Sequence, residues 1–223
     1  MIRYAVYGSA GCGRGVMPLI REQVALRDGD ADFVFVDDDP SRQGGEVNGV
    51  RCIPFGELIS ADLTSTRICV AVAESNVRRA LVEKCQAAGL EFFEVAAADH
   101  VRYDEVEIAS GAIFCASTMV TANVRIGAHF HCNIYSYVEH DCLIGDFVTF
   151  APRVSCNGNI IIEDGAYVGT GAVLKQGTPG RPLRVGKGAV VGMGAVVVRD
   201  VAPGSTVVGN PAQPLESQGY KEG

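Results

Sequence analysis

A histidine beside an aspartate is the pair in this chain best suited to acid–base chemistry. His140 and Asp141 stand together in the stretch EHDC. An imidazole has an unperturbed pKa of about 6.5, so it can accept a proton from an attacking amine near neutral pH. A neighbouring carboxylate can orient the ring and raise its basicity. We therefore predict that His140 is a general base assisted by Asp141, with a solvated surface histidine as the alternative interpretation.

Asn133 and two further histidines come shortly before this pair. Asn133 precedes His140 by seven residues and either lies near the reacting groups or belongs to a polar ladder on the surface. His129 and His131 stand two residues apart, but no third residue has a convincing metal-ligand spacing. We expect no metal, and a position on the surface or at an interface between copies of the chain for these two histidines.

A glycine-rich segment at residues 8–15, with the sequence GSAGCGRG, follows the first apolar run of the chain. Glycines between a strand and a helix let backbone N–H groups approach a diphosphate. Asp37, Asp38 and Asp39 follow the second apolar run, where an acidic residue can hold a ribose hydroxyl. The combination indicates a nucleotide site without a full NAD fingerprint. Arg78 and Arg79 are interpreted as part of a solvated helix face.

The elements that must position these nucleotide-binding residues alternate between strands and helices. This alternation predicts a small parallel sheet with helices on its faces, and such folds bind ligands at the carboxyl ends of their strands. The predicted elements are strands at 2–7, 33–36, 68–72 and 91–95, and helices at 16–26 and 76–88.

The elements that must position His140 repeat every six residues. A period of six fits neither an amphipathic helix nor an alternating strand, and it is typical of a hexapeptide parallel β-helix, in which three hexads close one coil. The apolar side chain of each hexad is expected to point into the coil. The series comprises Ile108, Phe114, Val120, Ile126, Cys132, Val138, Ile144, Phe150, Cys156, Ile162, Val168 and Leu174, then Val185, Val191 and Val197.

Glycines and a pause complete this pattern. Glycine directly follows the apolar residue at five positions, where it is predicted to permit a tight turn through a positive φ. The pause at 175–184, which carries two prolines and three basic residues, is predicted to be a loop extruded from one corner of the coil. The five glycines are Gly127, Gly145, Gly169, Gly186 and Gly192.

The two patterns divide the chain into three parts. We predict an α/β nucleotide-binding domain at 1–105, a β-helix at 106–212 and a flexible polar tail at 213–223.

Composition excludes several classes of protein. A net charge of -7 over 223 residues argues against a general nucleic-acid or anionic-membrane binder. The apolar runs are too short to span a bilayer, and we recognise no signal peptide. The eight cysteines are scattered and form no CxxC pair, which indicates a cytoplasmic protein with reduced thiols. Cys132 and Cys156 belong to the apolar series and are expected to be small buried hydrophobes.

Several long segments resemble the NeuD/PglD-type sugar acetyltransferases, and the resemblance covers nearly the whole chain. It implies a Rossmann-like domain followed by a left-handed parallel β-helix. It also implies acetyl transfer from acetyl-CoA to a nucleotide-linked amino sugar, by a homotrimer with its sites between neighbouring β-helices. The matching segments are YGSAGCGRGV, VDDDPS, AVAESNVRRALVEK, CNIYSYVEHDCLIGDF, CNGNIIIEDGAYVGTGAV and VVGNPA.

The resemblance also implies roles for single residues. It makes His140 the base with Asp141 beside it, and it places Asn133 near the thioester and the acceptor amine. Cys12 stands where the family usually has a histidine, and Thr149 where it often has a second one. The implied nucleotide-sugar contacts are Gly8, Ser9, Ala10, Asp37 and Asp38, and the implied acetyl-CoA contacts are Thr149, Gly158 and Gly169.

Three functions are compatible with these observations. We predict an acetyl-CoA-dependent N-acetyltransferase that acts on the amino group of a nucleotide-diphospho-4-amino-6-deoxysugar. The alternatives are a sugar O-acetyltransferase of the sialic-acid type and a non-enzymatic, nucleotide-binding β-helix scaffold. The dipeptide His140–Asp141 alone does not separate an amine acceptor from a hydroxyl acceptor.

Overall fold

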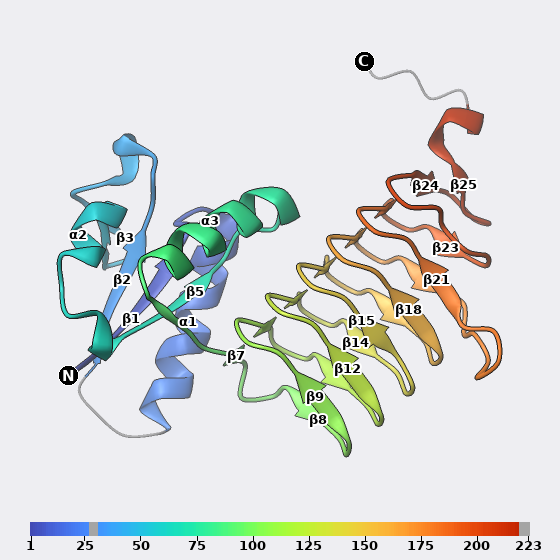
Figure 1. Ribbon diagram of the computed structural model, residues 1–223, viewed down its shortest axis with the longest axis horizontal. Helices are drawn as coiled ribbons and strands as arrows, with labels where there is room; N and C mark the ends of the chain where they lie inside the picture. The colour runs from blue at the N-terminus through green and yellow to red at the C-terminus, as the bar shows by residue number, and fades with distance from the viewer. Residues whose placement is uncertain (27–30, 219–223) are drawn as a thin grey trace. The chain divides into compact units, whose positions relative to one another are not determined.

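The computed structural model describes residues 1–26 and 31–218, and the chain forms two compact units (Figure 1). Unit 1 comprises Met1–Ala98 and Ser110–Ile113. Unit 2 comprises Asp99–Ala109 and the chain from Phe114 onward. Strand β8, Val101–Arg102, already pairs with β11, Met119–Val120, so coil structure begins before the predicted start at residue 106.

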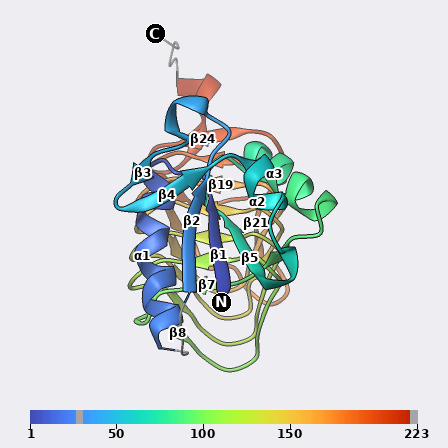
Figure 2. The same cartoon turned by 90° about the vertical axis from the view of Figure 1, so that its left-hand side faces the viewer.

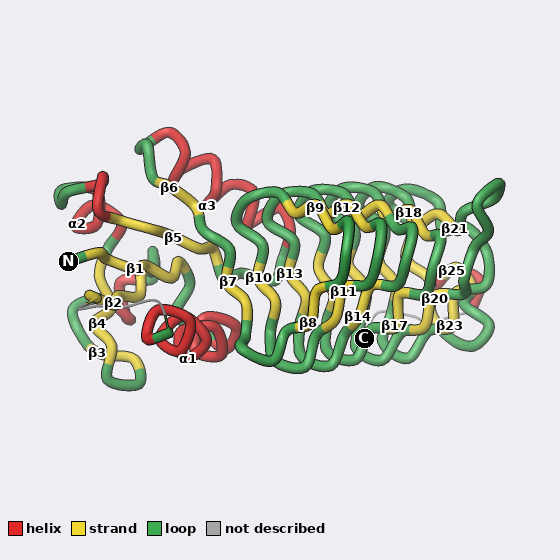
Figure 3. Tube along the Cα trace, turned by 90° about the horizontal axis from the view of Figure 1, so that it is seen from below, coloured by secondary structure: helices red, strands yellow, loops and turns green. Residues whose placement is uncertain are grey.

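Unit 1 is a small α/β fold around a mainly parallel sheet with the order β3-β4-β2-β1-β5-β6. Its β3–β4 pair is antiparallel. Helices α1 and α3 lie on opposite sides of the strands (Figure 2; Figure 3). The bounds are β1 Ile2–Tyr7, α1 Gly11–Ala25, β2 Ala31–Val36, η1 Pro40–Arg42, β3 Glu46–Val47, β4 Val50–Ile53, α2 Phe55–Ile59, η2 Leu63–Ser65, β5 Thr66–Val70, α3 Ser75–Ala87, β6 Glu91–Phe92 and β7 Val95–Ala96.

The core of unit 1 lies under the carboxyl-terminal halves of its strands. The last three residues of β1 and of β2 are buried, while their first residues are not. Helix α1 covers them with Val16, Met17, Ile20 and Val24, at the spacing of one helical face. The helix begins at Gly11, earlier than the predicted residue 16, so the strand-to-helix connection is only residues 8–10.

Unit 2 is a left-handed parallel β-helix whose strands stack into three sheets (Figure 3). Within unit 2 the sheet orders are β25-β24-β22-β19-β16-β13-β10, β23-β20-β17-β14-β11-β8 and β21-β18-β15-β12-β9. The remaining bounds are β9 Val106–Ile108, β10 Ile113–Phe114, β12 Val124–Ile126, β13 His131–Cys132, β14 Tyr137–Val138, β15 Leu143–Ile144, β16 Thr149–Phe150, β17 Ser155–Cys156, β18 Ile160–Ile162, β19 Tyr167–Val168, β20 Val173–Leu174, β21 Leu183–Val185, β22 Val190–Val191, β23 Val196–Val197, β24 Thr206–Val208, β25 Gln213–Pro214 and η3 Leu215–Gln218.

The six-residue series forms the interior of the β-helix, as predicted. From Phe114 to Val197 every member is buried, and Ile108 at the first coil is half-buried. Cys132 and Cys156 are fully buried among these aliphatic residues. Successive coils pair at a fixed offset, for example Met119 with Tyr137 and Tyr137 with Ser155. From β8 to β20, the backbone ladder therefore places each corner residue directly over the residue 18 positions later.

The corners of the coils carry a left-handed backbone conformation, but not at the glycines that the sequence suggested. The positive φ falls two residues after each of those glycines, for example at Phe147. Gly145 is needed for a different reason: a Cβ there would lie 2.6 Å from the Asp164 carboxylate and 2.7 Å from its backbone nitrogen on the next coil. These five glycines permit close stacking of coils. The positive φ of the turn lies two residues later, on His129, Phe147, Gly171, Gly188 and Gly194.

The interruption of the series is a corner loop, as predicted. The chain leaves the stack after Leu174 and re-enters it at β21, and Thr178 and Arg181 bond to each other across the loop. The predicted flexible tail differs from the structure at its start, because β25 pairs antiparallel with β24 and η3 follows. Residues 219–223 of that tail lie outside the described residues.

Neighbouring positions on β15 test the inward face of the coil. Ile144→Asp should lower the free energy of unfolding by about 4 kcal/mol or more, because it buries an unpaired carboxylate. Leu143→Asp is the matched control, since Leu143 is 45% exposed and Ile144 only 4% exposed. Urea unfolding measures both. Equal stability of the two variants would contradict the assigned interior.

Candidate active site

The predicted base and its carboxylate lie in one turn of the β-helix, between β14 and β15. The Nδ1 atom of His140 lies 2.7 Å from Oδ2 of Asp141. Because a carboxylate only accepts hydrogen bonds, Nδ1 carries the proton in this contact, and Nε2 is left as the nitrogen that can take up another. The imidazole is 42% exposed, so a substrate can reach it.

The turn fixes this pair through its backbone. Asp141 has a φ of 58°, in the left-handed region that Asp and Asn tolerate better than most residues. Its N–H donates to the carbonyl of Ala122 on the previous coil, and the Asn159 N–H donates to the carbonyl of His140. Asn123 also donates from Nδ2 to Asp141 Oδ1 at 3.4 Å, a contact that the sequence did not suggest.

A groove of about 560 Å³ follows the same corner of the β-helix. Its wall includes Asn123, Asp141 and Asn159, which occupy the same corner position on three successive coils. Pro179 and Pro182 of the corner loop contribute to its lining. The groove therefore offers polar side chains and a loop wall beside the His140–Asp141 pair.

The structure does not bring Asn133 to this pair within the chain. Asn133 lies in the turn before β14, whereas His140 lies in the turn after it. The Nδ2 atom of Asn133 donates to the carbonyl of Phe150 on the next coil at 2.6 Å. In a single chain, Asn133 therefore bonds within a different corner of the coil from the one that carries His140.

The three residues assigned to acetyl-CoA occupy different surroundings. Gly158 lies against the imidazole of His140, one coil further along the stack. The Gly169 N–H donates to the Val191 carbonyl at 2.7 Å and so belongs to the backbone ladder. Thr149 is buried on β16, in a different sheet from β14 and β15.

Two sequence interpretations of basic residues are wrong. His129 and His131 are buried, not exposed, and His129 stacks on Phe147 with ring centroids 5.1 Å apart. Arg78 is fully buried and donates to the carbonyls of Val72 and Ala73, the loop after β5. The sequence pattern could not predict the burial of Arg78, because an arginine in a helix is normally exposed to solvent. Within the described residues, no group of three or more His, Cys, Asp or Glu side chains could hold a metal ion.

The nucleotide-loop residues of unit 1 meet at the carboxyl ends of β1 and β2. Gly8 has a φ of 101°, and a Cβ there would lie 3.0 Å from the Ala71 carbonyl oxygen. Ser9 donates from both its backbone N–H and its hydroxyl to Oδ2 of Asp37, at 2.8 and 2.5 Å. Ala10 is the N-cap residue of α1. Asp37 thus fixes the shape of the loop.

Hydrogen bonds hold Asp37 in its charged form. Burial alone would raise the pKa of this carboxyl, but the bonds from Ser9 and Asp39, with the nearby Arg42, bring the pKa below its usual value. The charge of Asp37 is thereby compensated within the protein.

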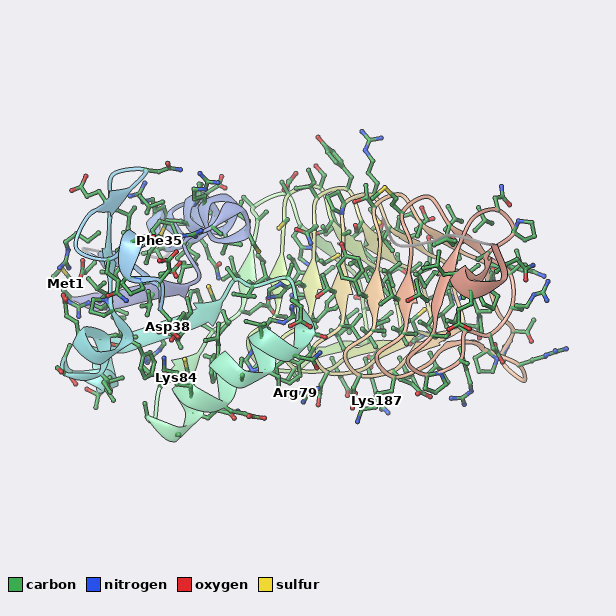
Figure 4. All side chains as sticks on the ribbon, turned by 90° about the horizontal axis from the view of Figure 1, so that it is seen from above. Met1, Phe35, Asp38, Arg79, Lys84 and Lys187 are labelled. Carbon is green, nitrogen blue, oxygen red and sulfur yellow. The ribbon has the colours of Figure 1, made fainter. Side chains whose placement is uncertain are left out.

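Asp38 belongs to a second polar cluster. Its carboxylate accepts from the Tyr7 hydroxyl at 2.8 Å and from Lys84 Nζ at 2.9 Å, and Figure 4 shows Lys84 and Asp38 close together. Lys84 Nζ also lies 4.4 Å from the centroid of the Phe55 ring. Burial, together with Asp38, raises the pKa of Tyr7 well above its ordinary value. A ligand that contacts Asp38 therefore meets a carboxylate that is already bonded to Tyr7 and Lys84.

A small pocket of about 250 Å³ lies beside the loop, lined by Ser9, Ala10, Arg14, Arg42 and Val47. The N-terminus of α1 adds its partial positive charge to the two arginines. This pocket fits an anionic group. The sequence interpretation missed Arg42, which lies beyond the acidic stretch; Arg14 was visible within the glycine segment but was given no role.

A parallel α/β unit followed by a left-handed β-helix with a His–Asp pair at one corner defines the hexapeptide acyltransferase class. The chain is 42% identical over 214 residues to GDP-perosamine N-acetyltransferase of Escherichia coli O157:H7, and the match covers 96% of each protein. No protein-family profile matches the chain.

Solved structures agree with that relative. WeeI from Acinetobacter baumannii AYE is 48% identical with a TM-score of 0.92, over 96% of this chain and 100% of that one. The acetyltransferase domain of PglB from Neisseria gonorrhoeae FA1090, in complex with acetyl coenzyme A, is 33% identical with a TM-score of 0.85, over 96% and 98%. The chain belongs to the NeuD/PglD-type sugar acetyltransferase family. None of the described helices has the length and apolarity needed to cross a membrane.

The lowered pKa of Asp37 predicts how acid acts on unit 1. Its folded-state pKa lies below the unfolded value of about 3.9, so the carboxylate stabilises the fold above that pH, and this contribution disappears as pH falls through the folded pKa. At pH 7, Asp37→Asn should cost about 1.5–3 kcal/mol, the usual value of hydrogen bonds to a charged group.

Urea unfolding followed by the helical circular-dichroism signal checks this prediction, because α1 and α3 belong to unit 1. The gap between wild type and Asp37→Asn should narrow between pH 5 and pH 3. The exposed Asp104→Asn serves as control. A gap that stays constant with pH would show that Asp37 does not act through its charge.

Proposed function

We propose that this protein is an acetyl-CoA-dependent N-acetyltransferase that acts on the amino group of a nucleotide-diphospho-4-amino-6-deoxysugar. The observation that carries the proposal is the half-exposed His140 ring, whose Nδ1 is held by Asp141 so that Nε2 is left for proton transfer. The full-length similarity to an enzyme named GDP-perosamine N-acetyltransferase supports the acceptor class.

The geometry suggests a direct transfer. The acceptor amine attacks the thioester carbonyl of acetyl-CoA, and Nε2 of His140 takes the proton that the amine loses as the C–N bond forms. The C–S bond then breaks, and the thiolate of coenzyme A leaves with a proton from the imidazolium. The Asp141 carboxylate stabilises the ring while it is charged. Holding amine and thioester together supplies the remaining rate enhancement.

Two separate binding regions serve the two substrates. The nucleotide diphosphate fits the pocket of Arg14 and Arg42 at the N-terminus of α1, a charge pattern that suits phosphate. Asp37 shapes this pocket through Ser9. Acetyl-CoA is bound by the related PglB domain, and here we assign its thioester to the corner of His140 and Gly158. A single chain does not bring Asn133, Thr149 and Gly169 to His140. The roles predicted for these three residues therefore require a second copy of the chain.

We expect the active form to be a homotrimer. Unit 2 exposes large apolar side chains that a second copy could cover, among them Tyr135, Tyr167 and Met193. A partner chain could also bring a residue such as Asn133 to His140. Sedimentation at micromolar concentration should show a trimer, and an active monomer would contradict this expectation.

An assay of thiol release from acetyl-CoA tests the acceptor class. GDP-perosamine should be acetylated, and a panel of UDP- and dTDP-linked 4-amino sugars would define the choice of nucleotide. The matched control is the same sugar nucleotide with a hydroxyl in place of the amine. Faster transfer to the hydroxyl compound would favour the O-acetyltransferase, and silence across the panel with an intact fold would favour a scaffold.

The base assignment predicts a large kinetic effect at one position. His140→Ala should lower kcat by about 100-fold or more, the usual scale for loss of a positioned base. Its Kd for acetyl-CoA, measured by calorimetry, should change little, because the ring acts on the amine. The acid limb of the wild-type pH–rate profile should also vanish in the variant. A near-normal kcat would place the base elsewhere.

Asp141→Asn separates charge from backbone geometry. Asparagine tolerates the left-handed corner as aspartate does, so the turn should persist while the negative charge is lost. We expect a fall in kcat of about 10-fold, smaller than that of His140→Ala, with an unchanged melting temperature. Stopped-flow or steady-state rates measure this. A loss equal to that of His140→Ala would mean that Asp141 does more than orient the ring.

A further inference from the structure

The imidazole of His140 lies directly on the backbone of Gly158. A Cβ built at Gly158 would lie 2.5 Å from Cε1, 2.6 Å from Nε2 and 2.9 Å from Nδ1 of the ring, and these are the three atoms nearest to it. Cβ atoms do not approach other atoms so closely. A side chain of any kind at position 158 would therefore displace the ring.

The backbone of Gly158 gives no other reason for glycine. Its φ is not among the positive values found at other glycines of the β-helix, such as Gly165 and Gly171. Its carbonyl accepts from the N–H of Gly177, in the corner loop, at 3.0 Å. The His140 ring is thus the group that would have to shift if position 158 carried an alanine.

The coil register explains why this contact exists. Position 158 is one coil, or 18 residues, after His140, and the Asn159 N–H bonds to the His140 carbonyl at 2.9 Å. On the previous coil the equivalent position is Ala122, which is also small. A large ring at the corner can lie along the stack only if its neighbours in this column have little or no side chain.

We propose that Gly158 is a positioning residue for His140. The imidazole rests on the bare backbone of Gly158 while its Nδ1 stays 2.7 Å from Asp141. A methyl group at 158 tilts the ring away and breaks the bond to Asp141. This inference rests on the proposed function for its kinetic consequence, but the contact itself does not. It also differs from a contact between the Gly158 amide and acetyl-CoA, which would not need His140.

A double-mutant cycle between positions 140 and 158 tests the proposal. Gly158→Ala should lower kcat by about 10- to 100-fold, the scale of a misplaced catalytic group, with less than about a threefold change in KM for acetyl-CoA. In the His140→Ala background the same substitution should change kcat by less than about twofold, because the ring through which it acts is gone. An equal loss in both backgrounds overturns the proposal and indicates a direct contact with acetyl-CoA.

Stability gives a readout that is independent of the reaction. Gly158→Ala should lower Tm by about 3 °C or more in the wild type, and by clearly less in His140→Ala, where the methyl group finds room. Gly180→Ala is the control, since a Cβ there meets nothing within 4 Å. Equal Tm losses in the wild type and in His140→Ala would contradict the proposal that Gly158 positions the ring.

Nitrogen-15 shifts of the imidazole complete the test. The chain has only four histidines, and His140→Ala identifies the signal of interest. The wild type should show a proton on Nδ1, and Gly158→Ala should shift the tautomer balance. An unchanged His140 signal overturns the proposal. A different outcome is that His140→Ala leaves kcat near normal, while Gly158→Ala still lowers Tm more in the wild type than in His140→Ala. The assignment of His140 as the base then fails, but the contact between Gly158 and the ring is supported.

Discussion

The stacking of one coil on the next is the constraint on which the rest of unit 2 depends. Each coil bonds to its neighbours through parallel backbone hydrogen bonds, and this ladder leaves the corners no freedom of register. In the described part of unit 2, nine non-glycine residues therefore have a positive φ, among them bulky Tyr135, Phe147 and Arg153. Such residues resist this conformation by about 1–3 kcal/mol each. They adopt it because two neighbouring coils hold each corner at once.

The candidate site makes use of the same constraint. Asp141 stands at a corner where the left-handed turn suits an aspartate, and the ladder aligns it with Asn123 and Asn159 on the adjacent coils. The carboxylate therefore has a fixed direction before any substrate arrives. In unit 1, Asp37 has a comparable role for the glycine loop, since it holds Ser9 at the end of β1. In both units an acidic side chain fixes the shape of the site through hydrogen bonds to neighbouring residues of the protein.

Local spacing predicted the features that depend on neighbouring residues in the chain. The six-residue series identified the interior of the β-helix, and adjacency alone paired His140 with Asp141. Contacts that depend on how distant strands meet were not visible. The bond between Ser9 and Asp37 requires β1 beside β2, and the burial of Arg78 requires the loop after β5. The glycines after the apolar series were recognised, but their cause is the approach of the next coil and not the turn. The separation of Asn133 from His140 follows from the three-sheet geometry, since seven residues span one face and end at the next corner.

The corner loop after Leu174 shows that the stack tolerates changes in length. Leu143 pairs with Ile161, 18 residues on, whereas Ile161 pairs with Arg184, 23 residues on, and the alignment of coils resumes unchanged. Extra residues at a corner therefore do not change how the coils pair. Evolution can lengthen or rebuild the wall formed by Pro179 and Pro182 without moving His140, so the shape of the groove and the chemistry of the pair are free to diverge independently.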